Sequence, residues 1–310
     1  MKVDSVETLD GRLVVLWDQG AELHRSEYSA AAIGDLRDYL VLSREPEPFS
    51  PAELPVIEWT GSASKLEEAR QTLMTSAAVL IRGLPSERGV ATSLAEAFGG
   101  VRLTEFGSCW DIQSSGEPGD LGFENLLVHT DSPYRDPRPG FQVLHCVRPA
   151  RLGGETIIVD GVAAAATLDA GQVCVLAETP VEFRYRRRML NLSTSAPILE
   201  TGIRGRPEAI RFNRRSMVGP IGSPERLAAW YEAFLTLTAL VDDSANQTRI
   251  RLNSGEAVIL NNHRMLHGRT AFDAANQQRL LQGAYGDLDS VRLASARHQE
   301  SLRGIGDFVG

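Results

Sequence analysis

The chain has 310 residues, a hydrophobic content of 43% and a formal net charge of -8 at pH 7. This length and composition allow one large domain with a sizeable core, or one domain with a small appendage. The negative charge argues against a nucleic-acid-binding protein, which needs a basic face to neutralise phosphates. Neither an apolar signal segment nor a run of about 18 apolar residues occurs. We therefore expect a cytoplasmic protein, not bound to membranes, whose partners are small molecules.

The cysteine content excludes two common stabilising devices. The three cysteines, Cys109, Cys146 and Cys174, are odd in number and show no CxxC spacing. A disulfide framework or a cysteine zinc site is therefore not expected, and each cysteine is interpreted as a small apolar residue.

The first part of the chain has the pattern of a small β module. Residues 12–17 and 21–28 are rich in strand-forming residues and flank a turn at residues 18–20. Residues 43–55 carry four prolines among acidic residues, which favours a linker. We predict a small N-terminal β module and linker over residues 1–55 and a second domain over residues 56–310.

The second domain is predicted to be mainly β with flanking helices. Helices are expected at residues 65–74 and 89–98, with a buried strand at 78–82 between them. A further helix should begin after Ser223, a good N-cap that is followed by Pro224. Short segments rich in β-forming residues recur, with glycine and proline between them, which indicates a sandwich or jelly roll. These segments are residues 142–147, 155–160, 181–185, 209–213, 248–252 and 257–260.

Three residues could form a metal site. His129 and Asp131 are two apart, so an extended strand would direct both side chains from the same face. His267 could complete a face of two histidines and one carboxylate, the pattern of non-haem Fe(II) oxygenases. Taken without context, His129 and His267 would more often be satisfied polar residues at strand ends than metal ligands. A zinc-hydrolase helix at His263 and His267 is not expected, because the glutamate general base between them is absent.

Three separated segments give that context. Residues 129–162, 261–272 and 279–291 occur in an order that resembles the γ-butyrobetaine hydroxylase branch of the Fe(II)/2-oxoglutarate-dependent oxygenases, within the TauD-like group. The similarity runs from about residue 78 to residue 293. It implies a double-stranded β-helix (jelly-roll) catalytic domain that uses O2 and 2-oxoglutarate to hydroxylate a C–H bond and releases succinate and CO2. It also implies a possible homodimer.

The resemblance assigns the cofactor residues. His129, Asp131 and His267 would bind Fe(II) and form the catalytic centre, and the carboxylate favours hydroxylation, because related halogenases lack it. Arg279, twelve residues after His267, would hold the distal carboxylate of 2-oxoglutarate through its guanidinium fork. Thr156 would be a second contact of this cosubstrate. No structural zinc is expected, because no cysteine precedes Cys109.

The resemblance also indicates a substrate site. Phe106, Trp110 and Tyr285 fall on the positions of an aromatic cage that holds a trimethylammonium group by cation–π attraction, and Phe123 would complete it. At the other end Asp120 stands where the family has an asparagine, and it would repel a carboxylate. Asn213 and Arg214 lie in a segment that the family uses near the substrate. These residues predict a small substrate that bears a quaternary ammonium or amine group.

The sequence leaves two other functions open. One is an oxygenase that acts on an amino-phosphonate or a natural-product intermediate. The other is a non-catalytic jelly-roll sensor that binds a metal and a ligand. A sensor has no need for the whole set of His129, Asp131, His267 and Arg279, so the sequence favours the enzyme.

Overall fold

The computed structural model describes residues 2–10, 12–18, 23–29, 54–113, 123–187, 189–202, 204–272 and 279–306. The chain divides into two compact units, Met1–Glu47 and Pro48–Gly310. Most of the expected linker, residues 43–53, lies outside the described residues, and the boundary near residue 55 stays a prediction. Among the helices that are described, none has the length and apolar character needed to cross a membrane.

The first unit contains one antiparallel sheet of three strands. Its order is β1 (Lys2–Leu9), β2 (Arg12–Asp18) and β3 (Leu23–Tyr28). The strands expected at residues 12–17 and 21–28 correspond to β2 and β3. The first strand, β1, was not predicted, because Lys2, Asp4 and Glu7 separate its apolar residues, which do not alternate with a period of two.

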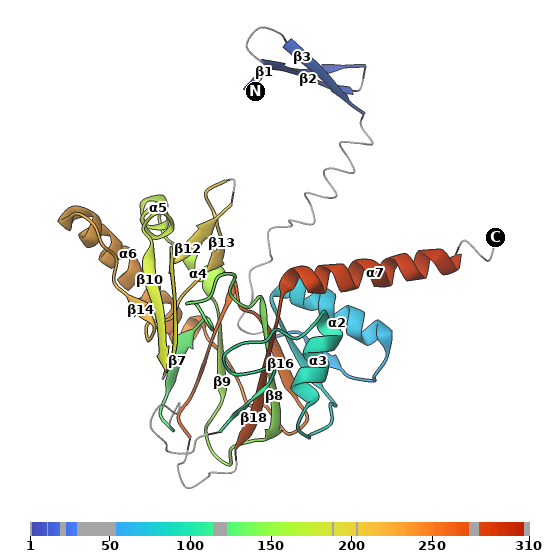
Figure 1. Ribbon diagram of the computed structural model, residues 1–310, viewed down its shortest axis with the longest axis vertical. Coiled ribbons are helices and arrows are strands. Elements are labelled where there is room, and N and C mark those ends of the chain that lie inside the picture. The colour runs from blue at the N-terminus through green and yellow to red at the C-terminus, as the bar shows by residue number, and fades with distance from the viewer. Residues whose placement is uncertain are drawn as a thin grey trace. The chain divides into compact units, whose positions relative to one another are not determined.

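The second unit is built on two sheets that face each other (Figure 1). The four-stranded sheet has the order β15 (Thr248–Ile250), β9 (Thr156–Asp160), β17 (Met265–Arg269) and β7 (Leu126–His129). The six-stranded sheet has the order β4 (Val56–Glu58), β5 (Ala78–Arg82), β16 (Ala257–Asn261), β8 (Phe141–Arg148), β18 (Leu280–Gly286) and β6 (Trp110–Ile112). A buried core joins Leu144 and Val258 of the larger sheet to Ile158 and Met265 of the smaller one. This arrangement confirms the expected jelly-roll architecture.

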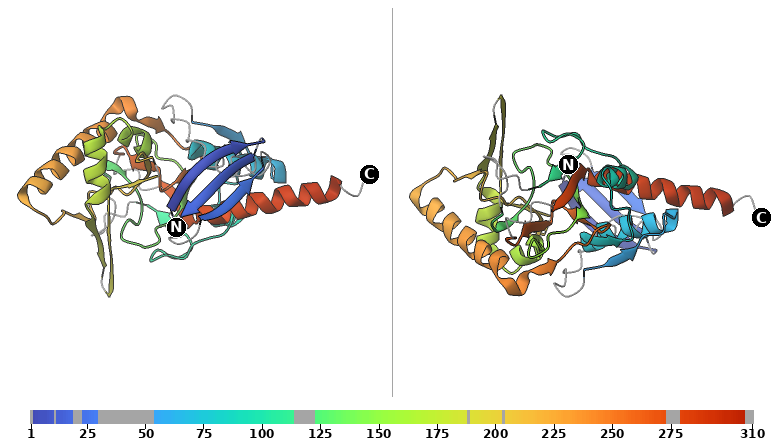
Figure 2. Two further views of the ribbon diagram at one scale, coloured as in Figure 1. Left: turned by 90° about the horizontal axis from the view of Figure 1, so that it is seen from above. Right: turned by 90° about the horizontal axis from the view of Figure 1, so that it is seen from below.

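Helices and short strands cover the outer faces of both sheets. Helices α2 (Ala63–Ser76) and α3 (Val90–Phe98) pack on the six-stranded sheet through a second buried core. On the outer side of the four-stranded sheet lie α4 (Gly161–Ala165), α5 (Ala170–Glu178) and α6 (Pro224–Asp242). Figures 1 and 2 show α6 and the last helix, α7 (Leu288–Gly306), on opposite flanks of this unit.

Smaller elements complete the side that carries α6. They are β10 (Val181–Arg187), β11 (Leu190–Ala196), β12 (Leu199–Thr201), β13 (Pro207–Ile210), β14 (Met217–Val218) and the 3-10 helix η1 (Ser244–Asn246). Ser223 caps α6 as predicted, since its hydroxyl accepts the N–H of Arg226 at 3.3 Å. The strand expected at residues 209–213 ends at Ile210 instead. Beyond Ile210 the chain leaves β12. The N–H of Phe212 donates to the Thr130 hydroxyl, and the Phe212 carbonyl accepts the N–H of Thr130.

The alternation of side chains along the strands decides which residues face the space between the sheets. On β17, Leu266 packs outward against the α6 side, whereas Met265 points into the core between the sheets. His267 is two residues after Met265 and therefore shares its inward face. The same rule directs Gln142 inward, since it is two residues before Leu144 on β8. Tyr285 on β18 is also inward, because its neighbour Ala284 packs outward beside α3.

Candidate active site

The two candidate histidine ligands are brought together by strand pairing. Strands β7 and β17 are antiparallel neighbours, and His129 lies directly opposite His267 in their register. Side chains that are directly opposite in such a pair meet on one face of the sheet. The ring centroids of His129 and His267 are accordingly 4.5 Å apart, and both side chains are buried.

Asp131 reaches the site in a different way from the one expected. Strand β7 ends at His129, so Asp131 does not continue it but lies in the bend that follows. Asn262, which is buried, holds the backbone of this bend. Its Oδ1 accepts the N–H of Asp131 at 2.8 Å, and its Nδ2 donates to the Asp131 carbonyl at 3.0 Å. The next residue, Ser132, has a φ of 48°, a left-handed conformation that costs energy in a non-glycine residue.

The three side chains form a cluster of the size of a metal site. Nε2 of His129 lies 3.2 Å from Oδ1 of Asp131, and Nε2 of His267 lies 3.7 Å from Oδ2. One ligand atom from each of the three residues lies within 4.8 Å of the others. Nδ1 of His129 is 2.9 Å from the Leu127 carbonyl, so it carries the proton there and Nε2 is left as the donor atom for a metal.

The charge states suit a divalent metal. Burial raises the pKa of Asp131, but His267, His129 and a hydrogen bond from Tyr285 outweigh it, and the pKa falls well below its ordinary value. Burial lowers the pKa of His267 to about 4, although Asp131 opposes this. At neutral pH the site therefore offers an ionised carboxylate and a neutral imidazole, the forms that bind metals. Two imidazoles and one carboxylate match the donor set of a non-haem Fe(II) centre.

Arg279 is a buried cation at the beginning of β18. It is 5% exposed, and burial, with a contribution from nearby Arg269, lowers its pKa to about 10, so it remains charged at neutral pH. Within the described part of the chain, no carboxylate lies within ion-pair distance of it. Burying a guanidinium without a counter-ion is costly, and an anionic ligand would remove that cost. The residue thus fits the distal carboxylate of 2-oxoglutarate.

Thr156 lies on the same side of the fold as Arg279. It is buried at the start of β9, opposite Arg269 of β17. Gly154, two residues earlier, has a φ of 70°, and a Cβ there would come within 3.2 Å of Nε of Arg279. Glycine at this position lets the arginine side chain pass close to the backbone that leads to Thr156.

Three of the four residues expected in an aromatic cage are in contact. The ring of Trp110 lies 4.4 Å from that of Tyr285 and 5.6 Å from that of Phe106. The row continues through Tyr185, 6.1 Å from Phe106, to Tyr134, which stacks on Tyr185 at 4.8 Å. We call these five residues the aromatic row. Faces of aromatic rings attract cations, so the row could hold a cationic group.

Gly283 makes room for the indole of this row. It lies opposite Trp110 in the pairing of β6 with β18. A Cβ at Gly283 would fall 2.3 Å from the indole ring, too close for any side chain. The absence of a side chain therefore lets the Trp110 ring lie across β18 beside Tyr285.

The remaining candidates for the substrate site are placed elsewhere or cannot be placed. Phe123 packs against Phe272 at 5.3 Å, and the guanidinium of Arg279 lies over the Phe272 ring, so Phe123 belongs to the Arg279 end. Arg214 forms a two-pronged ion pair with Asp242 of α6, at 2.6 and 2.8 Å. Asp120 lies outside the described residues.

Asn213 also differs from its expected role. Its Nδ2 donates to the Thr130 carbonyl at 3.2 Å, and its Oδ1 accepts the N–H groups of Arg215 and Ser216. All of these bonds hold backbone. Asn213 therefore supports the segment between His129 and Asp131.

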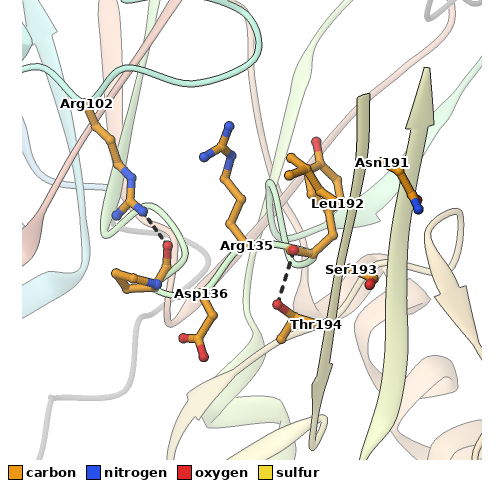
Figure 3. Close-up of a pocket in the computed structure, with 9 residues that line it drawn as sticks. Arg102, Arg135, Asp136, Asn191, Leu192, Ser193 and Thr194 are labelled. Carbon is orange, nitrogen blue, oxygen red and sulfur yellow. Dashed lines mark hydrogen bonds between the residues drawn. The ribbon is translucent and has the colours of Figure 1, made fainter. Parts of the chain in front are cut away.

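A pocket of about 410 Å³ opens beside Tyr134 (Figure 3). Its wall includes Arg102 and Arg135, and the far side is formed by residues 191–194 of β11. Both arginines already have carboxylate partners, Asp287 for Arg102 and Glu105 for Arg135. None of the three candidate metal ligands lines this pocket, so it is not the site of the chemistry.

Three residues near the site, Gln142, Tyr134 and Tyr185, were missed by reasoning from the sequence. Gln142 and Tyr285, which was already expected in the cage, both donate hydrogen bonds to Oδ2 of Asp131, Tyr285 at 2.7 Å. For Gln142 a signal was present, since a lone amide side chain interrupts the apolar strand of residues 141–147. Tyr134 and Tyr185 gave no comparable signal, because their contact depends on how a loop meets β10.

Comparison with known proteins extends these observations. The family model for the taurine catabolism dioxygenase TauD, TfdA family matches residues 44–285. A gamma-butyrobetaine dioxygenase from Pseudomonas sp. (strain AK-1) is 30% identical over 301 residues, which cover 91% of this chain and 77% of the relative. The Homo sapiens gamma-butyrobetaine dioxygenase is 27% identical over 255 residues, 78% of this chain and 66% of that protein.

Solved structures agree with the fold. An asparagine oxygenase in complex with Fe(II), 2S,3S-3-hydroxyasparagine and succinate is similar with a TM-score of 0.59 and 22% identity. The match covers 74% of this chain and 80% of that one. From the family match, together with the histidine–carboxylate cluster, we conclude that the chain belongs to the TauD/TfdA family of Fe(II)- and 2-oxoglutarate-dependent dioxygenases.

Proposed function

We propose that this dioxygenase hydroxylates a C–H bond of a small substrate that bears a quaternary ammonium or other amine group. One observation carries the proposal: Tyr285 belongs to the aromatic row and to the metal site at once. Its ring packs against Trp110 with centroids 4.4 Å apart, and its hydroxyl donates to Asp131 at 2.7 Å. A cation held on the row would therefore have its neighbouring carbon atoms next to the metal.

The metal site is proposed to consist of His129, Asp131 and His267. When bound, Fe(II) together with 2-oxoglutarate and O2 supplies the oxidant, and the cosubstrate leaves as succinate and CO2. Arg279 is proposed to hold the distal carboxylate of the cosubstrate, since its buried charge needs an anion. Thr156 is the proposed second contact, and the packing of Phe123 on Phe272 would close this end against water.

The chemistry of the aromatic row supports a cationic substrate. A quaternary ammonium group cannot donate a conventional hydrogen bond, so ring faces are its natural partners. Relatives named for γ-butyrobetaine, which carries such a group, are consistent with this choice. Tyr134 and Tyr185 extend the row, and we add them to the proposed contacts Phe106, Trp110 and Tyr285.

The opposite end of the substrate is proposed to differ from γ-butyrobetaine. Asp120, if it contacts the substrate, would repel a carboxylate. Arg214 is already neutralised by Asp242, so a role in binding an anion would require it to exchange partners. We therefore propose that neither Asp120 nor Arg214 favours binding of a simple carboxylate. Asn213 is proposed to hold the backbone between His129 and Asp131.

The test is a screen for substrate-dependent succinate release. Protein loaded anaerobically with Fe(II) and 2-oxoglutarate is exposed to O2 with quaternary amines, primary amines or amino-phosphonates. The proposal expects a quaternary or simple amine to raise succinate above the uncoupled background, and Asp131→Ala to abolish the increase. A response to amino-phosphonates alone would replace it with the alternative substrate class.

Two further proposals concern the assembly and the cellular compartment of the protein. The resemblance to the hydroxylase branch supports a homodimer, which light scattering at several protein concentrations would test. The need to keep the iron ferrous supports a reducing compartment such as the cytoplasm, which fractionation of cells would test.

A further inference from the structure

The two oxygen atoms of the Asp131 carboxylate have different surroundings. Oδ2 accepts two hydrogen bonds, from Nε2 of Gln142 and from the hydroxyl of Tyr285. Oδ1 instead faces Nε2 of His129 at 3.2 Å, closer than the 3.7 Å between Oδ2 and Nε2 of His267. A carboxylate oxygen has two lone pairs in its plane, so the two donors use the capacity of Oδ2. Oδ1 is the oxygen that is left for a metal.

Both donors are presented by neighbouring strands. Tyr285 on β18 and Gln142 on β8 are directly opposite each other in the strand register. Both face inward and are 2% exposed. The sheet thus delivers two donors to one atom.

The presence of an amide at position 142 costs stability. The inward neighbours of Gln142 on β8 are Leu144 and Cys146, both buried and apolar. Within the described residues, Oε1 of Gln142 is buried and has no hydrogen-bond partner. An unpaired buried carbonyl is unfavourable, and leucine would pack here without that loss. Among the described residues, the side chain of Gln142 makes a single polar contact, its bond to Asp131, so this bond is the reason for an amide at that place.

We propose that Gln142 and Tyr285 are positioning residues that occupy Oδ2 of Asp131 and so limit this ligand to a single metal bond through Oδ1. The inference rests on the proposed metal site. Two imidazoles and one carboxylate oxygen leave half of an octahedral coordination sphere open. If Oδ2 turned to the metal as well, one of those positions would be lost, and 2-oxoglutarate and a diatomic gas would compete for the rest.

The chain offers well-matched variants. Tyr285→Phe removes one donor and keeps the ring that packs against Trp110. Gln142→Leu removes the other donor and keeps the volume. Gln282→Leu is the control, because Gln282 is also a buried glutamine of the six-stranded sheet but bonds to Asp111 and to the N–H of Gly89.

The experiment measures nitric oxide binding, since this gas binds ferrous ions at the position that O2 takes. Each protein is loaded anaerobically with Fe(II) and 2-oxoglutarate. The iron content and the charge-transfer absorption of the complex are recorded before the gas is titrated. Because loss of residues that orient metal ligands costs about 10- to 100-fold in metal-site function, we expect Gln142→Leu and the double variant with Tyr285→Phe to bind nitric oxide at least about tenfold more weakly. Gln282→Leu should match the wild type.

The outcomes separate this inference from the proposed function. If the wild type takes up iron and 2-oxoglutarate but the variants bind nitric oxide as the control does, Gln142 and Tyr285 do not limit the carboxylate and the inference is wrong. If the wild type forms no charge-transfer complex at all, the proposed function itself fails. If the double variant does not fold, Gln142→Leu alone decides between the first two results.

Discussion

The metal end and the aromatic end of the space between the sheets are built by different means. At the metal end, His129 and His267 are cross-strand partners, and buried Asn262 fixes the backbone of Asp131 through two hydrogen bonds. At the aromatic end, the five rings come from two loops and from β6, β10 and β18, and ring contacts of 4.4 to 6.1 Å join them. The metal end thus depends on backbone pairing, whereas the aromatic end depends on contacts between side chains that can be substituted one at a time.

This difference has a functional consequence. A change of one ring in the aromatic row alters the shape and polarity of the substrate site but leaves the strand pairing of the metal end intact. A fold of this kind can keep one oxidative chemistry and vary its substrate. Tyr285 is the exception, because it contributes to both ends. Substitutions that separate the two ends therefore test the comparison.

The largest effect is expected for loss of a metal ligand. His267→Ala removes one of two imidazoles, so Fe(II) affinity should fall by more than about 100-fold, the upper range for changes that touch only the surroundings of a ligand. Substrate-dependent succinate formation should fall to background, and the circular dichroism spectrum should stay unchanged. His263→Ala is the control. If His263→Ala loses iron and His267→Ala keeps it, the ligand assignment is wrong.

The sequence predicted the metal end better than the aromatic end for a physical reason. His129, Asp131 and His267 are few and chemically distinctive, and the resemblance of three separated segments to a known family singled them out. Even so, the strand argument for Asp131 was wrong, because β7 ends at His129 and the clamp by Asn262 replaces it.

Aromatic residues give a weaker signal, because most of them are part of a hydrophobic core. Phe123 was expected in the cage but packs on Phe272, and Tyr185 was assigned no role although its ring lies between Phe106 and Tyr134. Those contacts depend on how β10 and the loop after Asp131 meet in three dimensions. Local sequence patterns contain no information about such tertiary contacts. Gln142 did carry a signal, a lone amide in an apolar strand, but its bond to Asp131 depends on where β8 lies relative to the loop after His129.

The second prediction concerns the cation beside the metal end. Arg279→Ala removes a buried charge that we propose pairs with the distal carboxylate of 2-oxoglutarate, and loss of such a pair costs about 2 to 5 kcal/mol. The KM for 2-oxoglutarate should rise by at least about 30-fold at unchanged Fe(II) affinity. Arg214→Ala, which removes an arginine already paired with Asp242, should leave this KM as it is. Equal effects of the two variants would show that Arg279 has no special contact with the cosubstrate.

A third prediction separates two histidines of the same segment by pH. Burial and the facing charges of Arg138 and Arg211 together lower the pKa of His263 to about 4, although hydrogen bonds to the carbonyl groups of Arg138 and Pro139 oppose them. The unfolded chain binds a proton near pH 6.5, so it binds more protons than the folded chain between pH 6.5 and 4. Stability due to neutral His263 is therefore complete above about pH 6.5 and is lost progressively down to pH 4.

The measurement is urea unfolding of metal-free protein as a function of pH. The loss attributable to His263 should be at most about 3 kcal/mol over that interval. His263→Gln should lose correspondingly less stability on acidification than the wild type. If both proteins lose the same amount of stability on acidification, His263 is not a buried neutral residue, and the pKa assigned to it is wrong.

The smallest effect is expected at the aromatic end, where the comparison can be tested most finely. Trp110→Leu leaves an apolar side chain beside Gly283 but removes the indole face. Binding of a cationic substrate should therefore weaken by about 0.5 to 2 kcal/mol. An uncharged isostere, in which carbon replaces the ammonium nitrogen, should lose less. Fe(II) affinity and the KM for 2-oxoglutarate should not change, because Trp110 touches neither the ligands nor Arg279. Equal weakening of charged and uncharged ligands would mean that the row acts only as an apolar wall, and altered Fe(II) affinity would mean that the two ends are not independent.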